Sequence, residues 1–129
     1  MRKTLISVLA MVLILALALP VFAAGGGTAS PQYTNVSDAY VILTLNGTTA
    51  NCTAKITGLS GASIDADIYL DLVYGTTTTQ IASWHRNTIG SLNFFDTATI
   101  VPGYTYRLTL DATVSRNGVD EPIYLTIDR

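Results

Sequence analysis

The sequence predicts an all-β fold, an antiparallel sandwich of about seven short strands. Residues Tyr104–Val114 alternate between apolar and polar side chains, which is the period of a strand with one buried face. A second alternating run, Ile64–Tyr74, carries three aspartates on its polar side. The dipeptides Asn46-Gly47 and Asn117-Gly118 lie between apolar runs, and Asn-Gly is the strongest short-range signal of a β-hairpin.

The first residues have the composition of an export signal. Arg2 and Lys3 are followed by an apolar run, Thr4–Leu19, and then by small residues that end at Ala23. We therefore expect residues 1–23 to be a signal peptide that is cleaved after Ala23. The apolar run is shorter than the roughly 20 apolar residues that a membrane-spanning helix needs, and no second apolar run follows it. We therefore expect a secreted or cell-surface protein with no membrane span after cleavage, and an uncleaved membrane anchor is the alternative.

The remaining 106 residues are enough for one domain. They hold five basic and nine acidic residues, a net charge of −4. This balance argues against nucleic acid and anionic membranes as partners, because both favour basic surfaces. Cys52 and His85 are the only residues of their types, so neither an internal disulfide nor a Cys- or His-based zinc site can form. We expect no metal and no cofactor.

A flexible leader is predicted for residues 24–38, because this stretch is rich in Gly, Ser and Pro at its start and has no periodicity. The domain is predicted to cover residues 39–129.

The first two strands are expected at Ala39–Leu45 and Thr49–Thr57. If Asn46-Gly47 forms the turn, the numbers of facing residues sum to 93, and Val41 lies opposite Cys52. This pairing predicts that the Cys52 thiol is buried in the core, where a thiol behaves as a small apolar group.

The alternating run at Ile64–Tyr74 is expected to be a strand with one wet face, followed by a loop of Gly75 and four threonines. A short strand then covers Gln80–Arg86. Its register is open because Ile81 and Trp84 fall on opposite faces, and we favour Trp84 at the edge of the core. The next strand, Leu92–Ile100, is expected in the opposite sheet.

The last two strands are joined by Asn117-Gly118, so facing residues sum to 235. This register pairs apolar residues with one another: Ala112 with Ile123, Leu110 with Leu125, and Leu108 with Ile127. It also predicts a cross-strand ion pair between Arg107 and Asp128 on the outer face.

The stretch Val101–Tyr106, with the alternating residues that follow it, resembles the sixth strand of fibronectin type III and related domains. The resemblance implies an immunoglobulin-like sandwich in which Tyr106 is the corner tyrosine that hydrogen-bonds backward across its loop. Leu108 stands where disulfide-bearing immunoglobulin domains carry a cysteine, so that subfamily is excluded.

The chain is also similar to a family of small, exported, uncharacterised bacterial proteins. The similarity is carried by the signal, by Asn51–Gly58, by Ser83-Trp84 and by the Pro102–Val114 strand. It implies no activity.

Strands three, six and seven of such a sandwich share a sheet, whose outer face collects polar residues that could bind a sugar or a cation. The expected members are Asp65, Asp67, Tyr69, Asp71, Arg107, Thr109, Asp111, Tyr124, Thr126 and Asp128. The alternative interpretation is a solvated face whose charges prevent association. Asp65 and Asp67 lack the Asp-rich loop of a calcium site, so no calcium is expected there.

Trp84 stands in sequence beside His85 and Arg86, and its indole could stack on a sugar ring or cover the core edge. No serine lies in a G-x-S-x-G elbow, so we expect no enzyme. The first hypothesis is an exported, non-catalytic β-sandwich that acts as an interaction or structural module, with a surface protein or glycan as partner. The alternative is a carbohydrate-binding module. The sequence leaves the oligomeric state open.

Overall fold

The computed structural model describes residues 33–129, which form seven antiparallel strands and no helix. The strands in chain order are β1 (Val36–Asn46), β2 (Thr49–Gly58), β3 (Ser63–Tyr74), β4 (Thr77–Ile89), β5 (Ser91–Thr99), β6 (Thr105–Arg116) and β7 (Val119–Asp128). They build an immunoglobulin-like sandwich, which confirms the predicted fold class. The predicted signal, residues 1–23, lies outside the described residues.

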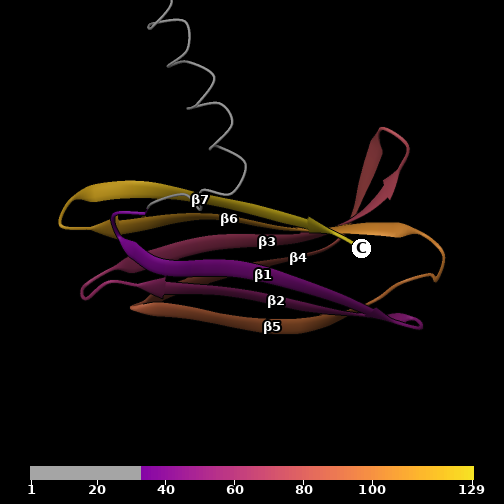
Figure 1. Ribbon diagram of the computed structural model, residues 1–129, viewed down its shortest axis with the longest axis horizontal. Coiled ribbons are helices and arrows are strands. Elements are labelled where there is room, and N and C mark those ends of the chain that lie inside the picture. The colour runs from indigo at the N-terminus through magenta and orange to yellow at the C-terminus, as the bar shows by residue number, and fades with distance from the viewer. Residues whose placement is uncertain (1–32) are drawn as a thin grey trace, which may run out of the picture. The chain divides into compact units, whose positions relative to one another are not determined.

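Two sheets make up the sandwich, one with the strand order β1-β2-β5 and the other with the order β4-β3-β6-β7. Figure 1 shows them as two stacked layers. The two strands with the clearest alternation, β3 and β6, are the interior strands of the larger sheet, so each has hydrogen-bonded neighbours on both sides. The fourth strand pairs with β3, whereas in constant-type immunoglobulin domains it pairs with the fifth strand.

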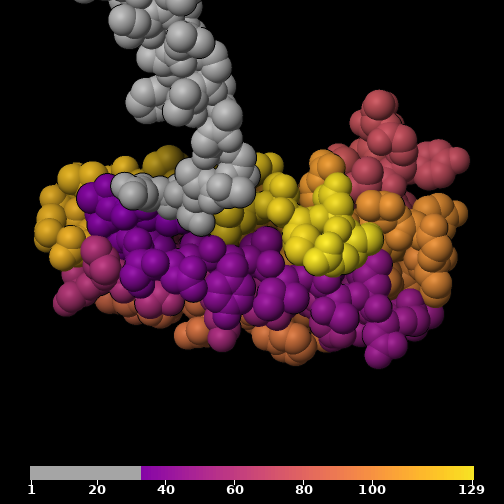
Figure 2. All heavy atoms as spheres, viewed as in Figure 1, coloured from indigo at the N-terminus to yellow at the C-terminus, as the bar shows by residue number. Residues whose placement is uncertain are grey.

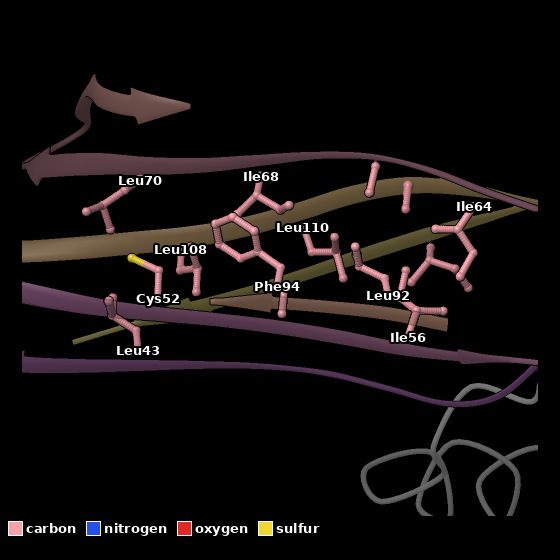
Figure 3. Packing of buried hydrophobic residues seen from close by; sticks show 14 of the residues in the cluster. Leu43, Cys52, Ile56, Ile64, Ile68, Leu70, Leu92, Phe94, Leu108 and Leu110 are labelled. Carbon is pink, nitrogen blue, oxygen red and sulfur yellow. The ribbon is translucent and has the colours of Figure 1, made fainter. Parts of the chain in front are cut away.

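The core lies between the two sheets and is built from the inward-facing residue of each alternating pair. Figure 3 shows these side chains pointing toward one another from both layers. The labelled members are Leu43, Cys52, Ile56, Ile64, Ile68, Leu70, Leu92, Phe94, Leu108 and Leu110. Cys52 is fully buried and free, as predicted.

The register predicted for the first hairpin is wrong by two residues. Gly47 and Thr48 form the turn, facing residues sum to 95, and Leu43 rather than Val41 lies opposite Cys52. The physical reason is that Gly47 alone takes a positive φ, 59°, as at the first central position of a type II′ turn. Because the shift is an even number of residues, the same side chains face the core.

The last hairpin has the predicted register. Asn117 and Gly118 both adopt positive φ, 53° and 76°, as a type I′ turn requires. Arg107 lies opposite Asp128, and the three predicted apolar pairs face one another as expected.

The domain begins earlier than the sequence predicted. β1 starts at Val36 rather than Ala39, so residues 36–38 of the predicted leader belong to the strand. Before it, Asn35 is 2% exposed, and its side-chain amide donates to the carbonyl oxygens of Val114 and Val119, each at 2.9 Å. The backbone nitrogen of Asn35 donates to the Glu121 carboxylate at 2.9 Å. These bonds tie the start of the domain to the β6–β7 hairpin.

The fourth strand is longer than predicted. Three of the threonines expected in a loop begin β4, and Gly75 and Thr76 alone make the turn. One extra residue, Ile81, interrupts the pairing where Leu70 faces Ala82 and Asp71 faces Gln80. Such a bulge bends a hairpin, and the β3–β4 tip projects from the sandwich in Figure 1.

Tyr106 closes the corner before β6, as the resemblance to fibronectin type III domains implied, and is buried. Tyr104 was expected to be part of the strand, but it precedes β6 and is exposed. Its ring lies 6.4 Å from that of Tyr74 at the projecting hairpin tip.

Candidate binding face of the four-stranded sheet

The outer face of the four-stranded sheet collects six of the nine acidic residues of the chain, and we call it the acidic face. The register aligns its side chains in rows across the strands. One row holds His85 on β4, Asp67 on β3, Asp111 on β6 and Tyr124 on β7. The acidic and aromatic members are Asp65, Asp67, Asp71, Asp111, Asp120, Asp128, Tyr69 and Tyr124. Asp120 was not among the residues predicted for this face.

His85 joins this face and bridges two of its carboxylates. Its Nδ1 lies 2.7 Å from Asp67 Oδ1, and its Nε2 lies 3.2 Å from Asp65 Oδ1. The hydrogen bond with Asp67 is the largest cause of a raised pKa of His85, and the charge of Asp65 adds to it. Ionised carboxylates only accept hydrogen bonds, so both contacts are satisfied together when the imidazole carries two protons.

Arg107 and Asp128 form the predicted cross-strand pair. The guanidinium makes two parallel hydrogen bonds, from Nε to Oδ1 at 2.8 Å and from Nη2 to Oδ2 at 3.0 Å. These bonds lower the pKa of Asp128 and raise the pKa of Arg107. Asp71 faces Arg107 from the other side, on β3, so this guanidinium lies between two carboxylates of neighbouring strands.

The middle of the acidic face is a row with Tyr69 on β3, Thr109 on β6 and Thr126 on β7. Thr109 points outward yet is only 6% exposed, so the neighbouring side chains cover it. Desolvation by its neighbours, and then the carboxylates of Asp67, Asp111 and Asp71, raise the pKa of Tyr69.

Trp84, His85 and Arg86 do not form a cluster, because successive residues of a strand point to opposite faces. His85 lies on the acidic face, whereas Trp84 and Arg86 turn toward the core edge over Phe94. The rings of Trp84 and Phe94 are 5.1 Å apart, and the Arg86 guanidinium lies 5.3 Å from the Phe94 ring centre. Trp84 therefore covers the core edge, as favoured from the sequence.

The outer face of the three-stranded sheet has a different character. One row holds Ile42 on β1, Thr53 on β2 and Phe95 on β5, and the neighbouring row holds Tyr40 and Lys55. Ile42 is 48% exposed and Phe95 is 65% exposed. The two outer faces of the sandwich thus differ, one acidic and the other largely uncharged.

Within residues 33–129, no group of three or more His, Cys, Asp or Glu side chains is placed to share a metal ion. Over the same residues, no helix is long and apolar enough to cross a membrane.

The positions of two further polar residues, His85 and Asn35, were not predicted from the sequence. His85 was not assigned to the acidic face because the bulge at Ile81 hides the register of β4 from any count of residues. Asn35 was placed in the leader, since a single buried amide breaks no periodicity. Its place directly before the apolar start of β1, Val36, is the only signal, and it is a weak one.

No protein-family model matches the chain, and no curated protein matches it. The chain is similar to the solution structure of CsgH from R. palustris, with 16% identity, a TM-score of 0.48, and coverage of 70% of this chain and 90% of that one. It is also similar to the β-glucuronidase of Parabacteroides merdae, with 10% identity, a TM-score of 0.47, and coverage of 70% and 13%.

A third similar structure is Spo0M, a sporulation control protein from Bacillus subtilis, with 15% identity, a TM-score of 0.42, and coverage of 73% and 49%. Likeness at this level carries no conclusion about activity, and the sandwich assignment rests on the strand order and register. Membership of the exported bacterial family stays a prediction.

Proposed function

We propose that the protein is an exported, non-catalytic β-sandwich that acts as an interaction module at the cell surface or outside the cell. We further propose that the acidic face binds a partner protein that presents positive charge. Export rests on the sequence of residues 1–23, and the binding face rests on the geometry of β3, β6 and β7.

The observation that carries the proposal is the concentration of charge on one surface. Six carboxylates share the acidic face with a single guanidinium, that of Arg107, and a single imidazole, that of His85. Solvent exposure alone does not require this concentration of charge, because the outer face of the three-stranded sheet is exposed to solvent and carries few charges. A field of one sign steers and orients a partner of the opposite sign.

The contacts of the only histidine support a role other than catalysis. Both ring nitrogens of His85 lie against carboxylates, those of Asp67 and Asp65. Nucleophilic catalysis by serine needs an imidazole within hydrogen-bond reach of the hydroxyl. Within the described part of the chain, the His85 ring makes its polar contacts with the two aspartates instead.

Carbohydrate binding is the alternative, and the positions of the aromatic residues favour it less. Tyr124 is exposed on the acidic face, and Tyr69 is half-buried there. Trp84 lies on the other side of its sheet against Phe94. The three rings named for sugar stacking therefore do not share one surface.

Binding to an immobilised decalysine peptide tests the proposal, with the wild type compared with two charge-matched double variants. Asp71→Asn/Asp111→Asn removes two charges from the acidic face, and Asp38→Asn/Asp96→Asn removes two from the other sheet, on β1 and β5. We expect the first variant to bind the peptide at least about 5-fold more weakly, because charges close to the peptide dominate its electrostatic attraction to the protein. The second should bind as the wild type does, and salt should weaken all three.

Equal loss in both variants would show that binding follows net charge rather than this face, and the proposal would fail. A glycan array with the same three proteins and the variant Tyr124→Ala tests the alternative. Hits that persist in both double variants and are lost in Tyr124→Ala would assign the protein to carbohydrate binding instead.

A further inference from the structure

The sandwich has four edge strands, because each of its two open sheets ends in two of them: β1 and β5, and β4 and β7. An edge strand presents a row of unpaired N–H and C=O groups that another chain can pair with. Natural proteins blunt such edges with inward-pointing charges, prolines and bulges. The four edge strands of this protein differ in how many of these protective features they carry.

Three of the edges carry such devices. On β4, Arg86 faces the inner side opposite Ala66, and Ile81 forms the bulge. On β5, Asp96 faces the inner side opposite the buried Cys52. On β7, Pro122 removes a donor and Glu121 faces the inner side opposite Val114.

The fourth edge, β1, is protected only at its start. An irregularity in the pairing with β2 lies between Val36 and Asp38. The stretch Ala39–Leu45 then runs for seven residues with no charge and no proline, and its Tyr, Val and Ile residues favour strands. A segment of this composition on a sheet edge is a ready template for strand pairing. Atoms of β1 form much of the surface that faces the viewer in Figure 2.

The turn decides which backbone groups of β1 are open. With Gly47 and Thr48 as central residues, Asn46 and Thr49 form a hydrogen-bonded pair. Hydrogen-bonded pairs alternate along an antiparallel ladder, so the N–H and C=O groups of Ala39, Val41, Leu43 and Leu45 point away from β2. Within residues 33–129, no other element pairs with β1 along that side.

We propose that β1 pairs antiparallel with β1 of a second copy of this chain, with Ile42 opposite Ile42. In this register Val41 faces Leu43 of the second copy, and Ala39 faces Leu45, so the open backbone groups of each strand meet those of the other. The inward pairs are all apolar. Asp38 faces the uncharged Asn46, so no like charges meet.

A second copy fits this edge better than other occupants do. The edge is self-complementary about Ile42, as a two-fold interface requires. The segment that precedes the domain, residues 24–32, contains three glycines and one proline in nine residues, and both types are depleted in strands. The dimer would join the two β1-β2-β5 sheets into one continuous sheet and leave both acidic faces free. The inference does not depend on what the acidic face binds.

Sedimentation equilibrium of the exported, purified chain tests the dimer. We expect the average mass to rise toward twice the monomer mass as concentration increases. Ile42→Lys should weaken this association at least about 10-fold, because two lysines would face each other across the axis. The matched control is Phe95→Lys, which changes an equally outward-facing apolar residue of the same row on the far strand, β5. It should associate as the wild type does.

Ile42→Cys gives an independent test of the register. A pair that is not hydrogen-bonded across the new ladder places its Cα atoms about 4.5 Å apart, within the roughly 4.4–6.8 Å of a disulfide. Oxidation should crosslink this variant to a dimer faster than Phe95→Cys. A monomeric wild type would overturn the proposal, and so would equal loss of association in both lysine variants, which would indicate contact between faces rather than edges.

Discussion

The hydroxyl of Tyr106 makes two hydrogen bonds with the backbone of Val101. It donates to the Val101 carbonyl oxygen at 3.1 Å and accepts from the Val101 nitrogen at 2.9 Å. The two bonds close the loop around Pro102 and Gly103, and the ring itself is 3% exposed. One side chain thus fixes the loop that carries the chain from one sheet to the other.

Replacing Tyr106 with phenylalanine should lower the free energy of unfolding by about 1–3 kcal/mol, because two bonds of about 0.5–1.5 kcal/mol each are lost. Chemical denaturation measures this change. Tyr104→Phe is the matched control, and it should change stability by less than about 0.5 kcal/mol because Tyr104 is exposed. A larger loss at Tyr104 than at Tyr106 would contradict the corner assignment.

The Cys52 thiol should resist labelling in the native protein. Burial, with a smaller contribution from Asp96, raises its pKa from 9.0 to about 11. At a given pH near 8 this shift lowers the reactive thiolate fraction about 100-fold, and burial limits access further. A chromogenic thiol reagent should therefore react at the rate of unfolding, and at full speed in denaturant. Rapid labelling of the native protein would show that the thiol is not in the core.

The phase of the strands could be predicted from the sequence, and the register could not always be. Alternation places Leu43, Cys52 and Leu108 in the core whichever turn is chosen, because an even shift keeps every side chain on its face. Only the φ angles of the turn distinguish Asn46-Gly47 from Gly47-Thr48. At Asn117-Gly118 both residues take positive φ, and there the count was right.

Most of the acidic face was predictable for the same reason, since β3 and β6 alternate over the residues that form it, and β7 alternates from Ile123 onward. Asp120 was missed because Glu121, a charged residue that faces inward, interrupts the alternation at the start of β7. The position of His85 on this face was not predictable, because the extra residue Ile81 shifts the register of β4 against β3. The start of the domain escaped prediction because Asn35 is held by backbone carbonyls 79 and 84 residues away. No local pattern reports such contacts.

Asn35→Ala should therefore cost much more than its place near the end of the domain suggests. The substitution removes the donors to a buried carbonyl group, that of Val114, and to a partly buried one, that of Val119. We expect a loss of about 2–4 kcal/mol of unfolding free energy. Asn46→Ala, at an exposed strand end, is the control and should stay within about 0.5 kcal/mol. Equal losses of unfolding free energy in the two variants would show that the bonds from Asn35 to Val114 and Val119 do not stabilise the start of the domain.

The Arg107–Asp128 pair should be detectable through the pKa of the Asp128 carboxyl group. The two hydrogen bonds from Arg107 lower the pKa of Asp128 below its usual 3.8. The pair therefore contributes stability above pH 3.8, and this contribution is lost as the pH falls through the lowered pKa. NMR titration of the Asp128 carboxyl carbon should show the low pKa in the wild type and a value near 3.8 in Arg107→Gln. An unshifted wild-type value would contradict the pairing.

His85 should titrate above its usual pKa of 6.5, because its hydrogen bond to Asp67 and the charge of Asp65 favour the protonated ring. A raised folded-state pKa means that the contribution to stability is fully present below pH 6.5. It is lost as the pH rises through the folded-state pKa. The imidazole proton signals report this directly, and the chain has a single histidine to assign.

Two substitutions and one control separate the causes of that shift. Asp67→Asn should lower the pKa of His85 more than Asp65→Asn does, since the 2.7 Å hydrogen bond is its largest cause. Asp71→Asn, on the same face but outside the His85 contacts, should leave it unchanged. The midpoint of thermal unfolding should fall more between mildly acidic and mildly basic pH in the wild type than in Asp67→Asn, because only the wild type loses the pairing over that range. A wild-type pKa at or below 6.5 would show that His85 does not bridge the two carboxylates in solution.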